Sequence, residues 1–116
     1  MTEIKIIKEP ITKQELKKIA EERFGDLVKG VVDINQGIIA LGGELHADEE
    51  VLLINKYGSK GEDTWGINLY PDKPKEQMLE FDSIINIKPS LNNKSRDVLD
   101  EAIREKIKQI IDKLIN

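Results

Sequence analysis

The densest run of chemically active side chains in this sequence surrounds its single histidine. Residues 42–50 read Gly-Gly-Glu-Leu-His-Ala-Asp-Glu-Glu, which places His46 two positions from both Glu44 and Asp48. Histidine is the side chain whose ordinary pKa lies nearest neutrality, and a neighbouring carboxylate raises that pKa and orients the ring. These are the requirements of general acid–base catalysis. We therefore predict catalytic roles for His46, Glu44 and Asp48, with proton transfer by His46 and hydrolysis as the reaction class.

The same block also offers ligands for a metal ion. One imidazole with carboxylate oxygens can hold manganese, iron or zinc, although zinc usually takes more nitrogen or sulfur. Magnesium or calcium would need only the carboxylates. The sequence has no second histidine, so it specifies no particular metal, and a divalent cation is kept as a candidate cofactor. Two structural interpretations stay open, because the acids at 48–50 can cap a helix and a lone histidine is often structural.

Strand periodicity predicts that further polar side chains share one face of a sheet. Successive side chains of a strand point to opposite sides, and three expected strands each carry an apolar face and a polar one. The polar faces include glycines at 42 and 66, which often mark the close approach of a ligand or of another backbone. The alternative is the solvated face of a one-sided antiparallel sheet. We predict a binding site on this polar face, lined by Asn68, Tyr70, Glu80, Asp82, Asn86 and Arg96.

Proline, glycine and hydrophobic periodicity divide the chain into short elements. Thr12 and Glu15 form a capping box ahead of an apolar stripe, which predicts the first helix. Asn35-Gln36-Gly37 separates two β-branched runs, as in a hairpin. The segment after His46 can form either a helix or a strand. The predicted elements are a strand over 4–8, a helix over 13–24, strands over 27–34 and 38–45, a helix over 49–57, strands over 65–70 and 78–88, and a helix over 96–114.

This order of elements predicts an α+β fold. Hairpin-length connections between consecutive strands favour a mainly antiparallel sheet of about five strands. The N- and C-terminal helices each have one apolar stripe, so we expect them to pack on one face of that sheet in a two-layer arrangement. A chain of 116 residues with no long linker predicts a single domain over 1–116.

Composition excludes several classes of protein. Eighteen basic and 22 acidic residues give a net charge of −4, which argues against nucleic-acid binding, since such domains usually carry a basic face. There is no cysteine, and hence no disulfide, thiolate metal site or cysteine nucleophile. No apolar run has the length of a membrane span, and no signal peptide opens the chain. We predict a cytoplasmic protein that binds neither nucleic acid nor membrane.

The acidic excess is concentrated in the middle of the chain. Residues 42–82 hold ten acidic and four basic residues, a net charge of −6. Such an excess can attract a basic partner. The alternative function is therefore a non-catalytic interaction module, with the C-terminal helix or a sheet edge mediating self-association. The predicted partners are a small-molecule ligand or a protein, and the predicted oligomeric state is monomer or homodimer.

Seven short stretches form a pattern that covers essentially the whole chain, at residues 9–11 (Glu-Pro-Ile), 24–26 (Phe-Gly-Asp), 31–33 (Val-Val-Asp), 42–50, 65–71, 80–83 (Glu-Phe-Asp-Ser) and 93–96. This pattern resembles a small prokaryotic family of domains of unknown function. The resemblance implies a stand-alone domain of this length. Because the family has no assigned activity, the resemblance assigns no functional residue.

Overall fold

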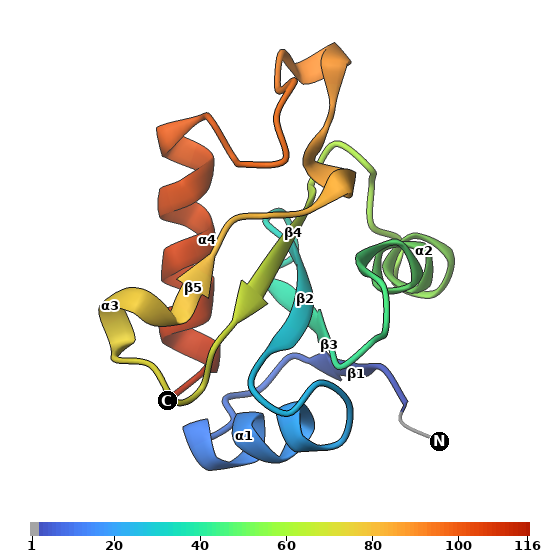
Figure 1. Cartoon of the computed structure of the whole chain (residues 1–116). Helices are drawn as coiled ribbons and strands as arrows, with labels where there is room; N and C mark the ends of the chain where they lie inside the picture. The colour runs from blue at the N-terminus through green and yellow to red at the C-terminus, as the bar shows by residue number, and fades with distance from the viewer. Residues whose placement is uncertain (1–2) are drawn as a thin grey trace.

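The computed structural model describes residues 3–116, and its centre is one antiparallel sheet (Figure 1). The strand order is β1-β3-β2-β4-β5, and each neighbouring pair is antiparallel. Gly37 closes the predicted hairpin with a φ of +70°, a left-handed conformation that glycine adopts without strain. The strands are β1 (Lys5–Ile7), β2 (Val28–Asp33), β3 (Ile38–Leu41), β4 (Thr64–Leu69) and β5 (Leu79–Glu80), with a one-turn helix, α3 (Lys75–Met78), before β5.

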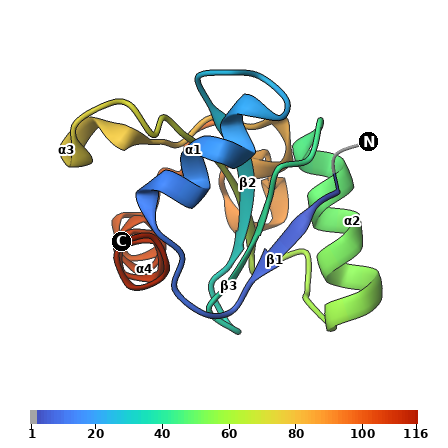
Figure 2. The same ribbon diagram turned by 90° about the horizontal axis from the view of Figure 1, so that it is seen from below.

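The first and last helices pack on one face of this sheet (Figure 2). α1 (Lys13–Glu21) begins after Thr12, whose hydroxyl accepts a hydrogen bond from the Glu15 N–H at 3.0 Å, as the capping box predicts. α4 (Glu101–Leu114) begins after Asp100, whose carboxylate accepts a hydrogen bond from the Ala102 N–H at 2.8 Å. The core on this face joins side chains of the strands with those of both helices, among them Leu16, Val32, Ile39, Trp65, Ile67, Ile107 and Ile111.

α2 (His46–Tyr57) covers part of the opposite face (Figure 2). Leu53 is fully buried there against apolar side chains of β2 and β3. Asp48 in the first turn of α2 complements the helix dipole, and Gly58 ends the helix with a φ of +70°. Of the two conformations that the sequence left open, this segment is therefore a helix.

The α+β class, the antiparallel five-stranded sheet and the packing of both terminal helices on one face are confirmed. Several predicted boundaries were wrong. The strand predicted over 38–45 ends at Leu41, because Gly42 adopts a φ of +88° and turns the chain. The strand predicted over 78–88 keeps only two residues, and the predicted terminal helices are shorter, ending at Glu21 and beginning at Glu101. No helix within residues 3–116 is long and apolar enough to cross a membrane.

Two buried asparagines explain the irregular segment between β5 and α4. The Asn86 side chain accepts from the Gly66 N–H at 2.7 Å and donates to the Gly66 carbonyl at 2.9 Å, so it replaces a paired strand residue. Asn93 donates to three carbonyl oxygens and accepts from the Leu99 N–H. Because these bonds offer the backbone an alternative to strand pairing, the segment forms two 3-10 turns, η1 (Ile84–Asn86) and η2 (Pro89–Leu91).

Candidate functional site

His46 is the first residue of α2 and not a strand residue. After β3 ends, Gly42 and Gly43 turn the chain, and Leu45 precedes the helix in an extended conformation. This turn brings the His46 ring against β4, where its Nε2 lies 2.8 Å from the carbonyl oxygen of Ile67. Only 9% of the residue is exposed. The ring therefore reaches the sheet from the end of a helix, and not from a neighbouring strand.

The surroundings of His46 favour its neutral form. Burial lowers the pKa of His46 and the positive charge of Lys29 lowers it further, whereas the Ile67 carbonyl, the Asn68 side chain and the charge of Asp82 oppose this shift. Because a carbonyl oxygen only accepts hydrogen bonds, the proton of the neutral ring is on Nε2, and Nδ1 carries the lone pair. At neutral pH the ring is therefore a base.

Asn68 links the histidine to a chain of polar residues. Its amide nitrogen donates to Glu80 Oε1 at 2.9 Å and to the Asp82 carbonyl at 3.2 Å. Both partners are acceptors, which fixes the orientation of the amide and directs Oδ1 away from them. The Tyr70 hydroxyl donates to the same Glu80 oxygen at 3.0 Å. We refer to His46, Asn68, Tyr70, Glu80 and Asp82 as the His46 cluster.

The exposed end of the His46 cluster carries an ion pair and a protonated hydroxyl. Arg96 Nε donates to Asp82 Oδ1 at 2.7 Å, and both side chains are about half exposed. Burial raises the pKa of Tyr70, and its hydrogen bond to Glu80 raises it further, so the hydroxyl keeps its proton at neutral pH. Of the six predicted lining residues, the structure joins five by hydrogen bonds: Asn68, Tyr70, Glu80, Asp82 and Arg96.

Glu44 and Asp48 lie away from the ring. Glu44 is exposed and its carboxylate is 4.0 Å from Arg23, and Asp48 is exposed in the first turn of α2. Side chains two positions apart on a helix point in different directions, so Asp48 faces away from His46. In the part of the chain that the structure describes, no hydrogen bond or ion pair joins either carboxylate to the ring.

One sequence profile matches residues 5–114, nearly the whole chain. The chain belongs to the DUF5674 family. This family is described as a protein of unknown function, which confirms the resemblance to a domain family without an assigned activity. Searches of curated proteins and of solved structures gave no match. For this DUF5674 chain, the chemistry of the site therefore rests on its own residues.

The DUF5674 chain also buries a carboxyl group that the sequence assigned only to helix capping. Glu49 is 0% exposed, and its Oε2 accepts a hydrogen bond from the Gly43 N–H at 3.0 Å. Within residues 3–116, its Oε1 has no partner. Burial raises the pKa of Glu49 well above its ordinary value, so the neutral acid is favoured. The sequence did contain a sign that Glu49 is buried near His46. The two residues are three positions apart, which places them on one face of a helix.

The remaining predictions concern a metal and the sixth lining residue. Among the described residues of the DUF5674 chain, no group of three or more His, Asp or Glu side chains is arranged to hold a metal ion. Asn86 is fully buried and uses its side chain to bind the backbone of Gly66. The sequence did not single out Lys29 or Glu49 for this site. Lys29 acts on the His46 ring through its charge, and Glu49 lies three positions after His46 on α2.

Proposed function

We propose that the His46 cluster binds a small neutral molecule and that Nδ1 of His46 accepts a proton from it or from a water molecule beside it. The observation that carries this proposal is the fixed, neutral ring. Nε2 is held by the Ile67 carbonyl at 2.8 Å, which leaves the lone pair on Nδ1. A positioned base of this kind is what general base catalysis requires.

The lone pair on Nδ1 supports the proposal. Among the described residues, the buried polar atoms without a partner are Glu49 Oε1, Trp65 Nε1 and Asn68 Oδ1. Nδ1 of His46 is not one of these atoms, and the ring nitrogen that meets the Ile67 carbonyl is Nε2, so the lone pair of the neutral ring is on Nδ1. The Asn68 side chain raises the pKa of His46, so it favours the ring once it has taken up a proton. The His46 cluster can therefore hold the proton that His46 takes up.

The other residues of the site supply groups for recognition. The protonated Tyr70 hydroxyl and the Asp82–Arg96 ion pair lie toward the exposed end, where they can bind hydroxyl or amide groups of a ligand. Lys29, in register with Asn68 on the neighbouring strand, disfavours a cationic ligand. We therefore expect a neutral, hydrogen-bonding ligand, with base-assisted hydrolysis as the reaction class.

Hydrolysis of 4-nitrophenyl acetate tests this proposal. Water adds to the ester carbonyl while the ring takes its proton, the bond to the phenol oxygen breaks, and 4-nitrophenolate is released. We expect a rate about tenfold or more above that of free imidazole at equal concentration. The rate should fall only below the ordinary pKa of histidine, 6.5, because burial lowers the pKa of His46.

Substitutions separate this mechanism from its competitors. His46→Gln should reduce the rate to background, whereas Glu62→Gln, in an exposed loop, should not change it. Equal rates for the wild-type chain and H46Q would overturn the proposal. Glu44→Gln and Asp48→Asn test the predicted catalytic carboxylates. A lower rate in either variant would show that the carboxylate takes part in catalysis, and an unchanged rate would show that His46 acts without it. Reaction of the single histidine with diethyl pyrocarbonate reports independently whether Nδ1 can be reached.

The outer face of α2 supports a second candidate function, a protein-interaction module. Val51 and Ile54 are exposed on this helix, and Leu45 is exposed just before it. Asp48 lies one turn from Val51 on the same side and is exposed as well. An apolar strip beside an acidic group fits a partner segment that is both apolar and basic.

A synthetic amphipathic helix of leucine and lysine is a probe for this second function. We expect binding that weakens as salt is added and that is reduced by Asp48→Lys and by Val51→Ser. The control is Glu101→Lys, an exposed change in the first turn of α4. An affinity for the peptide that does not change with salt or with either α2 substitution would count against the interaction module.

A further inference from the structure

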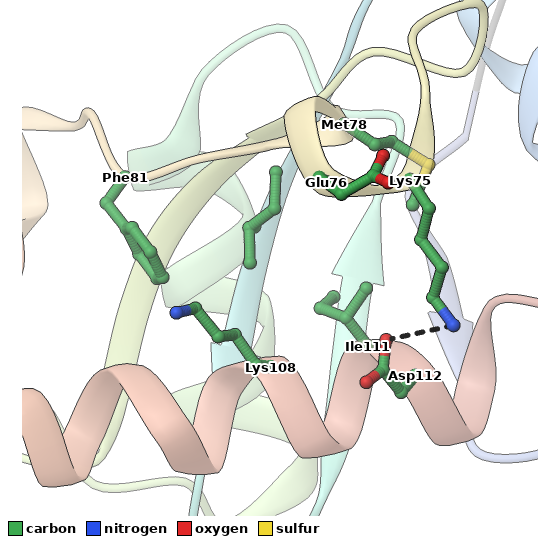
Figure 3. A pocket seen from close by; sticks show the side chains of 8 residues that line it. Lys75, Glu76, Met78, Phe81, Lys108, Ile111 and Asp112 are labelled. Carbon is green, nitrogen blue, oxygen red and sulfur yellow. Dashed lines mark ion pairs between the residues drawn. The ribbon is translucent and has the colours of Figure 1, made fainter.

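A hollow of about 420 Å³ lies between α3 and α4 and is lined by none of the residues of the His46 cluster (Figure 3). Binding sites for small molecules typically measure about 300–1,000 Å³ and combine a mostly apolar lining with a few polar groups. This hollow has both properties. We call it the α3–α4 groove. Its apolar lining is Met78, Leu79, Phe81 and Ile111, and its charged rim is Lys75, Glu76, Lys108 and Asp112.

One wall of the α3–α4 groove is held in place before any ligand arrives. The guanidinium of Arg104 lies over the Phe81 ring, 4.6 Å from its centre. Arg104 is itself fixed, because it donates to the Val98 carbonyl at 2.6 Å and to Asp97 Oδ1 at 2.8 Å. A ring locked in this way loses little conformational entropy when an apolar group packs against it.

The charged rim presents a positive and a negative group one helical turn apart. Lys108 and Asp112 lie four positions apart on α4 and flank Ile111, with the amino end of Lys108 beside Phe81 (Figure 3). Residues with this spacing have Cβ atoms about 6 Å apart on the helix surface. Their present partners are weak, since Lys108 is 3.9 Å from Glu105 and Asp112 is 3.7 Å from Lys75 on exposed surface. Both groups can therefore be recruited by a ligand.

We propose that the α3–α4 groove binds an α-amino acid with a large apolar side chain. The side chain packs on Phe81, Met78 and Ile111, the carboxylate meets Lys108, and the ammonium group meets Asp112. The rim carries two positive and two negative residues, so its charge complements a zwitterion better than a ligand with a net charge. This site is independent of the proposed function of the His46 cluster.

Titration of the full chain with L-phenylalanine, 3-phenylpropionate and phenethylamine tests the proposal by NMR. The three probes share an aromatic body but carry both charges, only the carboxylate, or only the ammonium group. We expect saturable shifts at Met78, Phe81 and Ile111 with L-phenylalanine, and affinities about fivefold or more lower for the other two. The His46 ring signals should not move, which separates this site from the one proposed above.

Two charge variants on the solvent side of α4 assign the contacts. Lys108→Met should lower the affinity for L-phenylalanine and 3-phenylpropionate about fivefold and leave phenethylamine unchanged. Asp112→Asn should lower the affinity for L-phenylalanine and for phenethylamine and leave the affinity for 3-phenylpropionate unchanged. Lys106→Met, exposed on the same helix and outside the groove, is the control. Equal affinity for the three probes, tighter binding of either singly charged probe, or no saturable shift in the groove would each overturn the proposal.

Discussion

Two buried polar regions of this protein differ in how completely their hydrogen bonds are made. Around Asn86 and Asn93, both side-chain amides bond to backbone groups of Gly66, Arg96 and Leu99, among others. In the first turn of α2 and on β4, the described structure leaves Glu49 Oε1 and Asn68 Oδ1 buried without a partner. The same chain therefore contains one polar network that is fully paired and one that is not.

The difference separates scaffold from candidate site. A fully paired buried network rigidifies the fold, and the Asn86 network holds the irregular segment after β5 against β4. Near His46, buried polar groups lack partners within residues 3–116, and burial shifts the pKa values of His46 and Glu49. Such features mark a candidate functional site. The contrast supports a function at His46. Substitutions in both regions test whether the two networks differ in this way.

The largest effect is expected for Asn86→Ala. This change removes three hydrogen bonds. It leaves the buried N–H and carbonyl groups of Gly66 without their partner, whereas the Arg96 carbonyl keeps its hydrogen bond from the Ser83 N–H. We expect a loss of about 3–5 kcal/mol in the free energy of unfolding, measured by urea denaturation. Asn55→Ala, at an exposed position of α2, is the control. A similar effect for both variants would mean that the Asn86 network is not a scaffold.

Glu49→Gln should stabilise the protein at neutral pH, by about 1–3 kcal/mol. Burial raises the pKa of Glu49 above its ordinary value of 4.5. As pH rises past 4.5, the unfolded chain releases this proton before the folded chain does, so the stability of the wild type falls until the folded-state pKa is reached. Because glutamine does not ionise, the stability of the variant does not fall over this pH range.

Urea denaturation from pH 4 to pH 8 measures the effect of Glu49→Gln. The difference between the variant and the wild type should be small at pH 4 and grow with pH. Glu62→Gln, in an exposed loop, should give a difference that stays near zero. A pH-independent difference for Glu49→Gln would mean that the carboxyl group is ionised in the folded protein.

His46→Gln should change stability less, and in the opposite pH direction. Burial lowers the pKa of His46 below its ordinary value of 6.5. When pH falls below 6.5, the unfolded chain takes up a proton first, so the wild type loses stability until the lower folded-state pKa is reached. H46Q should not show this loss, and the two chains should have parallel pH profiles above pH 7. A wild type that gains stability over H46Q on acidification would indicate a raised pKa.

The smallest effect is expected for Lys29→Met, read from the His46 ring signals in an NMR pH titration. Loss of the positive charge beside the ring should raise the pKa of His46 slightly, toward its ordinary value, because Lys29 contributes to lowering it. Lys60→Met, in an exposed loop, should leave the pKa of His46 unchanged. An unchanged titration in Lys29→Met would remove Lys29 from the electrostatics of the site.

Features with a local cause could be predicted from the sequence. The capping box at Thr12 and the two-residue alternation of β4 depend on neighbouring residues. Thr12 caps α1 as predicted, and Trp65, Ile67 and Leu69 share the main core, although both faces of β4 are buried. The alternation also predicted that Asn68 and Glu80 share a face, and they are hydrogen-bonded at 2.9 Å. The lengths of β3 and β5 could not be predicted, because Gly42 and Ser83 can equally continue a strand or turn the chain, and contacts from distant segments decide between these.

The amino-acid sequence by itself determined the α+β class, the order of the elements apart from α3, and the density of polar residues around His46, since these follow from periodicity, capping and composition. The tertiary structure decided which polar groups meet. It brought His46 to the Ile67 carbonyl, buried Glu49 against Gly43, turned Glu44 and Asp48 outward and made Asn86 a partner of β4. These contacts join residues up to 21 positions apart in the chain. Local sequence patterns cannot predict them, because such patterns depend only on neighbouring residues.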